Sequence, residues 1–536
     1  MTALPNATQP TILTSQSMKP PVVPSAQPGE TSQGVIDSQT FRVIEVDQLF
    51  TAIDHTTTAI GRAVLYRSLT APSASADSIR AKQEAVRELE SEPALRDGLG
   101  VMLAEAAKLE GDFYDLLFAE FLGMIGSPAH PLEKGGFGYE SYRRGTRFWL
   151  DLVARADSLP KPRSAYLGER IESLRRFRDS RAFRLMRGPV YRTEHALKTA
   201  EEKGLLTPAL RFNPSLFKPV GLTVFVVALV LLMQFMPLLL DMVASMGPLL
   251  WLFLFPLGFV YIPIVGAFDR DGCIYPLRKL FKESPDVQGA LDALGAVDEL
   301  LSFVRYREAF GHPVCLPDIE QGTRHSLRVT GVRNPVLAKD HPDYVANDID
   351  LSDERLSFVT GPNSGGKTAF CKTLAQTQLL AQIGCYVPAS SAALTPADRI
   401  FYQVPEISHL SDGEGRFGTE LKRTKAIFLA SSAHSLVIMD ELSEGTTNEE
   451  KMEISVSVLD GFREMGNSTV LITHNHELVD AYRRRGIGLA RQVEFLDENP
   501  TYRLVEGISR VSHADRIAKK IGFSKADIAK YLTGRR

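Results

Sequence analysis

The sequence predicts an α/β domain in its last third and, in front of it, a helical region that is interrupted by a two-helix transmembrane hairpin. Three observations lead to this prediction. The glycine-rich stretch GPNSGGKT at 361–368 lies between a strand-like and a helix-like segment. Residues 40–213 carry apolar side chains at helical spacing. The stretch 219–268 contains a single charged residue, Asp241.

Composition and length set the class of protein. An apolar share of 44% and a charged share of 23% are typical of folded domains, and 536 residues predict more than one of them. A formal net charge of −3 argues against a chain that coats nucleic acid through bulk charge. The cysteines form neither a metal-like pair nor a disulfide framework, which suits a reducing compartment; they are Cys273, Cys315, Cys371 and Cys385.

Residues 1–38 are predicted to be a disordered tail. They are rich in Pro, Ser, Thr and Gln and lack the basic-then-apolar pattern of a signal peptide. A docking peptide is the alternative interpretation of this segment.

Two stretches are predicted to form the halves of one helical domain, residues 39–213 and residues 271–325. In DSIRAKQEAVRELE, which begins at Asp77, apolar residues recur at steps of three and four, with charges on the other face. The segment that begins with Ser284 and Pro285 has the same period and a typical helix start.

Residues 214–270 are predicted to be a transmembrane hairpin. One helix through the whole uncharged stretch would be roughly 75 Å long, more than twice the hydrocarbon thickness, so two spans joined by a turn at 241–247 fit better. Positive residues flank both outer ends, among them Lys218 and Arg270. Both termini are therefore expected in the cytoplasm, at the inner membrane of a bacterium. A buried helical hairpin inside a large core is the alternative.

Eight arginines lie within 170–192 and predict a basic surface that binds an anionic partner. They fit anionic lipid headgroups, and they also fit a nucleic-acid backbone. Their closeness in sequence to the predicted hairpin favours lipid. The candidate contacts are Arg175, Arg176, Arg178 and Arg181.

The stretch 361–368 satisfies the phosphate-binding pattern G-x-x-x-x-G-K-[ST] in the required context, after a strand and before a helix. Glycines allow backbone N–H groups to close around phosphates, and the helix start adds its positive end. We expect Lys367 to reach the β- and γ-phosphates of ATP and Thr368 to ligate Mg²⁺. The predicted ATP-binding residues in this loop are Gly361, Pro362, Asn363, Ser364, Gly365, Gly366, Lys367 and Thr368.

Two further strands complete the predicted site. SLVIMDELSEG ends an apolar strand at Asp440 and Glu441, which suit a Mg²⁺ ligand and a general base respectively. STVLITHNHEL ends another strand before His474, which we expect near the γ-phosphate as a second catalytic residue. The three motifs together predict an ATP hydrolase.

In this order the motifs resemble those of the MutS family, the ATPases of DNA mismatch repair. YVANDIDL, TGPNSGGKT, SLVIMDELSEGTT, LITHNHEL and GISRVSHADRIAKKIGF carry the resemblance, which extends to LFTAIDHTTTAIGRAVLYRSLTAP. It implies an ABC-type ATPase domain over 326–536 with a helical dimerisation segment at its end, and an all-α core, or lever, domain in front. It also implies a homodimer, an aromatic stack of Tyr344 on adenine, and a switch role for His474.

Three departures from the family pattern affect the expected function. The residues before position 40 leave no room for mismatch-recognition and connector domains. The hairpin interrupts the core where the family inserts its DNA clamp. The trans-acting Ser-Thr-Phe element aligns with Gly415, Arg416 and Phe417, which bears on the rate of hydrolysis rather than on binding. Ser411 and Arg416, the latter as an arginine finger, are the candidate substitutes.

The sequence therefore predicts a membrane-anchored, dimeric ATPase that binds and hydrolyses ATP and transmits the change through a helical lever to the hairpin. The alternative is a nucleic-acid-binding relative, tethered to the membrane, that acts in DNA repair or DNA processing. A transporter fits poorly, because two spans per chain are few for a translocation path. The lipid bilayer and a second copy are the expected partners, and a protein partner is left open.

Overall fold

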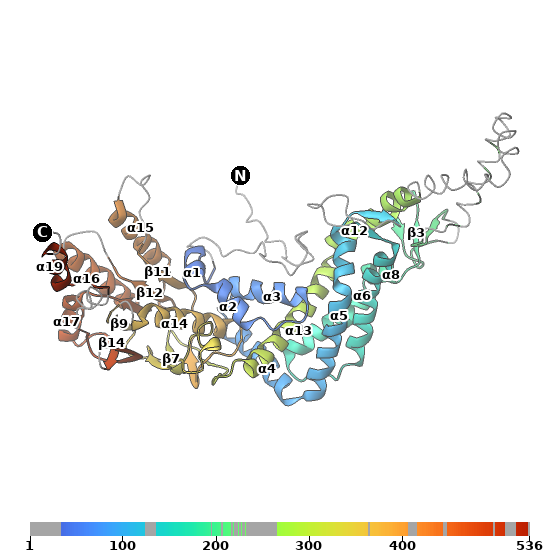
Figure 1. Ribbon diagram of the computed structural model, residues 1–536. Helices are drawn as coiled ribbons and strands as arrows, with labels where there is room; N and C mark the ends of the chain where they lie inside the picture. Colours follow the sequence, from blue (N-terminus) through green and yellow to red (C-terminus); the bar gives the residue numbers. More distant parts are fainter. Residues whose placement is uncertain are drawn as a thin grey trace. The chain divides into compact units, whose positions relative to one another are not determined.

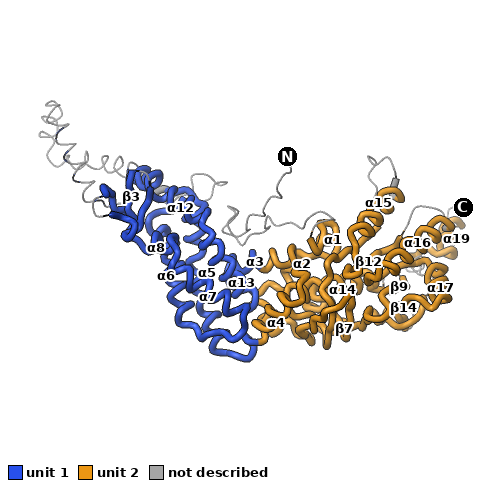
Figure 2. The backbone as a smooth tube through the Cα atoms, turned by 180° about the vertical axis from the view of Figure 1, so that it is seen from behind, with its two compact units in different colours: residues 1–25, 56–64, 88–301 blue, residues 26–55, 65–87, 302–536 orange. Residues whose placement is uncertain are grey.

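The structure is a computed structural model that describes residues 34–533 except for 124–135, 195, 205–206, 216–217, most of 219–264, 363–364, 406–414, 443–447, 497–498 and 510–520. The described residues form two compact units, shown in blue and orange in Figure 2. Unit 1 contains residues 56–64 and 88–301, and unit 2 contains residues 34–55, 65–87 and 302–533.

Unit 1 is mainly helical. The long helices α5 and α6 lie side by side (Figure 1), and their aromatic residues form its core. Phe113 stacks on Phe148 with ring centroids 5.4 Å apart, and Trp149 lies 4.7 Å from Phe177. These rings are buried. The helices of the unit are α5 (Pro93–Phe118), α6 (Tyr139–Ser158), α7 (Ala165–Arg176), α8 (Arg181–Arg187), α12 (Tyr275–Glu283) and most of α13 (Pro285–Ala309).

Short strands complete unit 1. β3 (Val190–Arg192) pairs antiparallel with β4 (Leu197–Lys198) and with β5 (Leu210–Phe212). β1 (Phe121–Gly123) pairs parallel with β2 (Phe137–Gly138). The sequence predicts an all-helical domain here and misses these small sheets, because strands of two or three residues leave no periodic signal.

The sequence predicts a membrane localisation with two spans and both termini in the cytoplasm. This prediction is wrong. Among the described residues, no helix is long and apolar enough to cross a bilayer, whereas a span needs about 20 apolar helical residues. Most of the predicted hairpin 214–270 lies outside the described residues. Its flanks belong to unit 1, where Lys218 Nζ lies 2.9 Å from Asp269 Oδ2 and the Tyr139 hydroxyl donates to the same carboxylate.

Unit 2 is built on a six-stranded sheet of order β11-β12-β13-β9-β14-β15, in which only β15 runs antiparallel to its neighbour among these described strands. Every residue of the central strands β9 and β13 is buried, as expected for parallel strands covered on both faces. The strands are β9 (Leu356–Thr360), β11 (Ile400–Gln403), β12 (Leu436–Asp440), β13 (Ser468–Ile472), β14 (Leu489–Leu496) and β15 (Asn499–Glu506).

Helices cover both faces of this sheet. Phe358, Val437 and Met439 share one hydrophobic cluster with residues of α15, α16 and α17. α14 packs against β12 and β13, and since alternate residues of a strand point to opposite faces, it covers the other side. The helices are α14 (Lys367–Gln382), α15 (Gly415–Ala430), α16 (Asn448–Met465) and α17 (His476–Arg484), and α19 (Lys525–Thr533) follows near the C-terminus.

A four-stranded sheet of order β6-β10-β7-β8 also belongs to unit 2. Its strands are β6 (Asp318–Ile319), β7 (Leu327–Val332), β8 (Asn347–Asp350) and β10 (Ser391–Leu394). β7 pairs antiparallel with both β10 and β8. This sheet supplies β8, whose first residue, Asn347, lines a pocket beside the glycine-rich loop.

The first described residues pack on unit 2. Ile36, within the predicted tail 1–38, is fully buried and forms a parallel bridge with Ile400; residues 1–33 lie outside the described part. α1 (Ser38–Val43) and α2 (Val46–Ile53) are tied to α14, where the Gln376 amide donates to the Ile44 carbonyl and Lys372 pairs with Glu45. Segments that the sequence groups with the helical domain thus join unit 2, together with the unit 2 parts of α3 (Ala59–Thr70) and α4 (Ala76–Ser91).

His325 is fully buried next to β7, at the end of the sheet opposite to the glycine-rich loop. Its backbone N–H donates to Ala433 O and its carbonyl accepts from Arg355. Burial lowers the pKa of the ring to about 4, although the neighbouring Gln378 side chain and the charge of Asp398 act in the opposite direction.

The stability of the protein should therefore depend on pH through His325. Its folded-state pKa of about 4 lies below the ordinary 6.5, so protonation favours the unfolded chain. The contribution of His325 to the free energy of unfolding is fully present above about pH 6.5. It falls by roughly 3 kcal/mol as the pH drops to about 4. His325→Gln should flatten this dependence in urea unfolding of the full chain at several pH values. His341→Gln, at an exposed position, is the control, and equal slopes in the two variants would contradict the prediction.

Candidate nucleotide-binding site

The glycine-rich loop connects β9 to α14. β9 ends at Thr360 and α14 begins at Lys367. Gly366 has φ +81°, a left-handed conformation that suits glycine. A Cβ at Gly365 would lie 2.9 Å from Val493 Cγ2, so β14 can approach the loop only because this residue has no side chain. Asn363 and Ser364 lie outside the described residues, and Gly361 and Pro362 open the loop after β9 as the sequence predicts.

Lys367 lies inside this loop rather than on the surface. Only 2% of the residue is exposed, and its Nζ donates to Gly361 O at 2.6 Å. Burial lowers the pKa of Lys367, while the negative charges of Asp440 and Glu441 oppose that effect. The ammonium is thus held within the bend of the loop, where phosphate-binding lysines act.

The structure brings Thr368 and Asp440 together. The Thr368 hydroxyl donates to Asp440 Oδ2 at 3.0 Å, which joins the first turn of α14 to the end of β12. Hydroxyl and carboxylate oxygens are ligands that Mg²⁺ accepts. These two side chains would hold a Mg²⁺ ion when a nucleotide is bound, and the ion would supply charge neutralisation at the phosphates.

Glu441 follows Asp440 and points toward the end of β13. Its backbone has φ +64°, and its N–H donates to Ile472 O at 2.9 Å. The carboxylate accepts from the His474 backbone N–H at 2.7 Å and from the Thr473 hydroxyl at 3.3 Å. The His474 ring Nε2 lies 3.9 Å from Glu441 Oε1. The two predicted catalytic residues are therefore neighbours.

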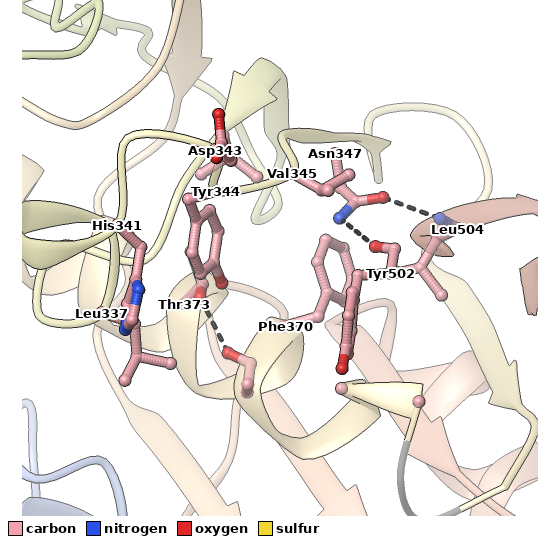
Figure 3. Close-up of a pocket in the computed structure, with 14 residues that line it drawn as sticks. Leu337, His341, Asp343, Tyr344, Val345, Asn347, Phe370, Thr373, Tyr502 and Leu504 are labelled. Carbon is pink, nitrogen blue, oxygen red and sulfur yellow. Dashed lines mark hydrogen bonds between the residues drawn. The ribbon is translucent and has the colours of Figure 1, made fainter. Parts of the chain in front are cut away.

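A cavity of about 470 Å³ opens beside the loop, a size typical of small-molecule sites. Figure 3 shows Tyr344 on one side of it and Phe370 and Tyr502 on the other. The Tyr344 hydroxyl is hydrogen-bonded to Thr373 of α14, and burial raises the pKa of this tyrosine. Flat aromatic walls beside a phosphate loop suit a nucleotide base.

Tyr502 is a member of this pocket that the sequence does not predict. It lies in β15 with φ +59°, which is uncommon for a tyrosine. The Asn347 side chain holds the backbone at Tyr502 and just after it, donating to Tyr502 O at 3.0 Å and accepting from Leu504 N at 2.7 Å. A Cβ on Gly366 would lie 3.3 Å from the Tyr502 ring, so the ring also packs on the loop.

The side chains of the two predicted trans-acting residues lie outside the described part of the structure. Ser411 lies outside the described residues, and Arg416 lies in the first turn of α15 with its side chain outside the described part. Their role stays a prediction.

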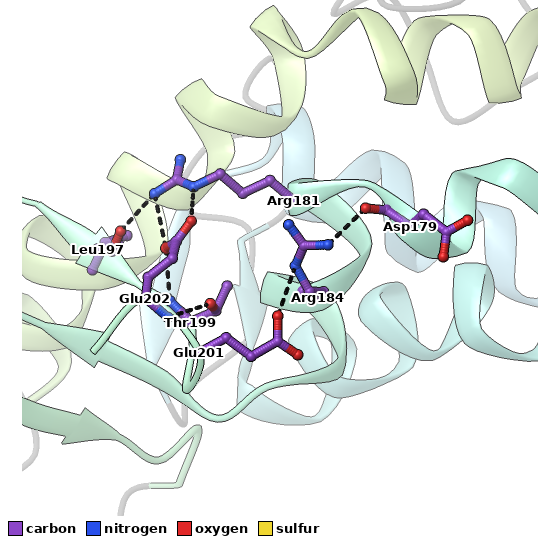
Figure 4. A network of polar contacts seen from close by, with 7 residues as sticks. All are labelled: Asp179, Arg181, Arg184, Leu197, Thr199, Glu201 and Glu202. Carbon is purple, nitrogen blue, oxygen red and sulfur yellow. Dashed lines mark hydrogen bonds and ion pairs between the residues drawn. The ribbon is translucent and has the colours of Figure 1, made fainter. Parts of the chain in front are cut away.

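The arginine run belongs to unit 1, and three of its four candidate contacts have partners within that unit. Arg181 pairs with Glu202 at 2.6 Å and donates to Leu197 O (Figure 4). Arg175 donates to Ala156 O and Leu159 O, and Arg178 pairs with Asp157. Arg176 is exposed. A contact of these arginines with nucleic acid or lipid stays a prediction, and it would have to compete with these internal pairs.

A parallel sheet with a glycine-rich loop, a carboxylate pair and an aromatic base pocket defines the class of P-loop ATPase domains. Residues 357–529 match the family model for MutS domain V. This part of the chain is therefore similar to the ATPase domain of MutS-family proteins.

Curated relatives match the chain over less than half of its length. The DNA mismatch repair protein MutS of Prochlorococcus marinus (strain MIT 9301) is 30% identical over 47% of this chain and 29% of its own length. DNA mismatch repair protein Msh6 of Homo sapiens is 34% identical over 38% of this chain and 16% of its own length. MutS of Chlorobaculum tepidum is 34% identical over 45% and 28% respectively. The chain thus spans less than a third of the length of these relatives.

The aromatic wall can be tested through Tyr502. Replacing it with Ala should weaken the binding of a fluorescent ATP analogue by about 5-fold to 150-fold, since stacking of a base on an aromatic ring contributes about 1–3 kcal/mol. Tyr502→Phe keeps the ring and should bind like the wild type. Fluorescence titration measures both, and an unchanged affinity of the Ala variant would contradict this assignment.

Proposed function

We propose that the protein binds and hydrolyses ATP with Mg²⁺ as a homodimer. The observation that carries this proposal is the convergence of three strand ends: the loop after β9, Asp440 at the end of β12 and His474 after β13, with Glu441 bonded to the last of these. The match of this part of the chain to MutS domain V supports it.

The residues divide the reaction between them. Lys367 would bind the β- and γ-phosphates, and backbone N–H groups of the loop at 361–366 would surround them. Glu441 would orient the attacking water and accept its proton. His474 shares a hydrogen bond and a close ring contact with that carboxylate, so it would report the state of the γ-phosphate to Glu441.

A second copy is the proposed partner. Helix α19 has no buried residue, and it exposes 57% of Tyr531 and 64% of Leu532. Apolar side chains gathered on one short helix suit a contact with another protein surface. The family resemblance assigns dimerisation to this segment, so we propose that α19 contributes to the dimer.

Duplex DNA is the proposed effector, because the matched relatives are named DNA mismatch repair proteins. The ATP-dependent change would reach unit 1 through α13, which belongs to unit 1 up to Leu301 and to unit 2 from Ser302. A further protein partner, if one binds, would be identified by pull-down experiments with the full chain.

Turnover of ATP by the purified full chain tests the proposal, measured with and without duplex DNA. Lys367→Ala is the blank, because it removes the ammonium from the phosphate loop. Turnover above this blank would support the hydrolase, and stimulation by DNA would support the effector. Turnover equal to the blank under both conditions would refute the hydrolase.

Glu441→Gln should separate binding from hydrolysis. The amide cannot accept the proton from water, so turnover should fall at least about 100-fold, within the range that general bases contribute. ATP binding should persist, and ATP-loaded dimers should accumulate. Turnover assays together with crosslinking or light scattering measure these effects, and a Glu441→Gln variant with wild-type turnover would remove Glu441 from the mechanism.

A further inference from the structure

A lysine from a different element lies against the general base. Lys451 belongs to the first turns of α16, and its Nζ is 3.7 Å from Glu441 Oε2. The Lys451 side chain is 20% exposed and that of Glu441 is 8% exposed. The pair is therefore largely withdrawn from water, where an ion pair is screened less than at the surface.

The place of Lys451 in its helix is unfavourable by itself. Backbone N–H groups give a helix start a positive end, which favours acidic side chains and disfavours cations. The preceding residues Glu449 and Glu450 follow that rule and are exposed. Lys451 departs from it, and its ammonium points to Glu441 instead of solvent, so the contact with the carboxylate offsets the unfavourable position.

Glu441 needs such a contact because its own backbone holds it in an uncommon conformation. A residue other than glycine at φ +64° costs of order 1 kcal/mol or more and persists where the surroundings hold it. Oε1 is held by the His474 N–H at 2.7 Å, a short hydrogen bond. Oε2 is held by the Thr473 hydroxyl at 3.3 Å, a longer one, and by Lys451.

We propose that Lys451 is a positioning residue for ATP hydrolysis, which fixes the Oε2 side of the Glu441 carboxylate and so sets the direction from which this base meets water. This inference rests on the proposed hydrolase function. Lys451 lies outside every motif by which the sequence identifies the site, and nothing in its local pattern marks it. It ties the general base to α16, whereas Thr473 and His474 tie it to β13.

The role predicts a loss of turnover without a loss of binding. Lys451→Met keeps the length of the side chain and removes its charge. Its kcat should fall about 10-fold to 100-fold, the size expected when a catalytic group is misplaced by a fraction of an ångström to 1 Å. The affinity for a fluorescent ATP analogue should stay within about twofold of the wild type, because Lys451 does not line the nucleotide pocket. Lys451→Arg keeps the charge and should recover most of the turnover.

Two comparisons make the test specific. Arg463→Met removes a cation from the exposed surface of the last turn of the same helix and should leave kcat unchanged. In a Glu441→Gln background, Lys451→Met should have little further effect, because the group on which it acts is already disabled.

The outcomes separate this inference from the function on which it rests. Wild-type turnover equal to that of Lys367→Ala would refute the hydrolase and this role together. A hydrolysing wild type with Lys451→Met at wild-type kcat would refute the positioning role alone. A parallel loss of affinity and kcat in Lys451→Met, or a failure of Lys451→Arg to recover turnover, would show a general structural role and would also overturn the proposal.

Discussion

Burial of β9, β12 and β13 on both faces of the sheet determines where the ends of these strands lie. Their register is set by the parallel ladder, which pairs Asp440 with Ile472 and Ile472 with Val359. A slip of one residue would move every side chain to the opposite face, into a close-packed layer shaped for other side chains, so packing specifies the register. The phosphate loop, Asp440 and the Glu441–His474 contact all inherit their positions from this ladder.

Much of the nucleotide site could be predicted from sequence because its residues follow strands at short range. Lys367 and Thr368 begin a helix directly after a strand, and Asp440 ends an apolar run, so local spacing places them. Tyr502 and Lys451 could not be predicted in this way. Tyr502 is positioned by Asn347, which lies 155 residues away in the chain, and Lys451 belongs to a different element from its partner Glu441. Only the fold brings these groups to the site.

Charge and hydropathy patterns along the chain are less reliable guides to what a segment contacts. The arginine run suggests an external partner when the charges are counted along the chain, yet Glu202 and Asp157 lie close enough in unit 1 to pair with two of them. The hydropathy of 219–268 predicts two spans, whereas no helix among the described residues meets the requirements of one. For the arginines, the pattern is a property of one segment, while its meaning depends on groups that lie elsewhere in the chain. The ends of α1 and α2 are likewise tied to α14 by contacts with residues more than 300 positions away.

The link between Asn347 and Tyr502 has a consequence for local stability. Asn347 begins β8 of the four-stranded sheet, and Tyr502 lies in β15 at the edge of the six-stranded sheet. A base held between Tyr344 and Tyr502 would therefore contact the segment that leads into β8 and the edge strand β15 at once. Ligand binding stabilises whatever conformation binds it, in proportion to the logarithm of ligand concentration over Kd. Occupancy of the pocket would thus slow the opening of the β14–β15 hairpin, and amide hydrogen exchange at that sheet edge would become a gauge of nucleotide concentration.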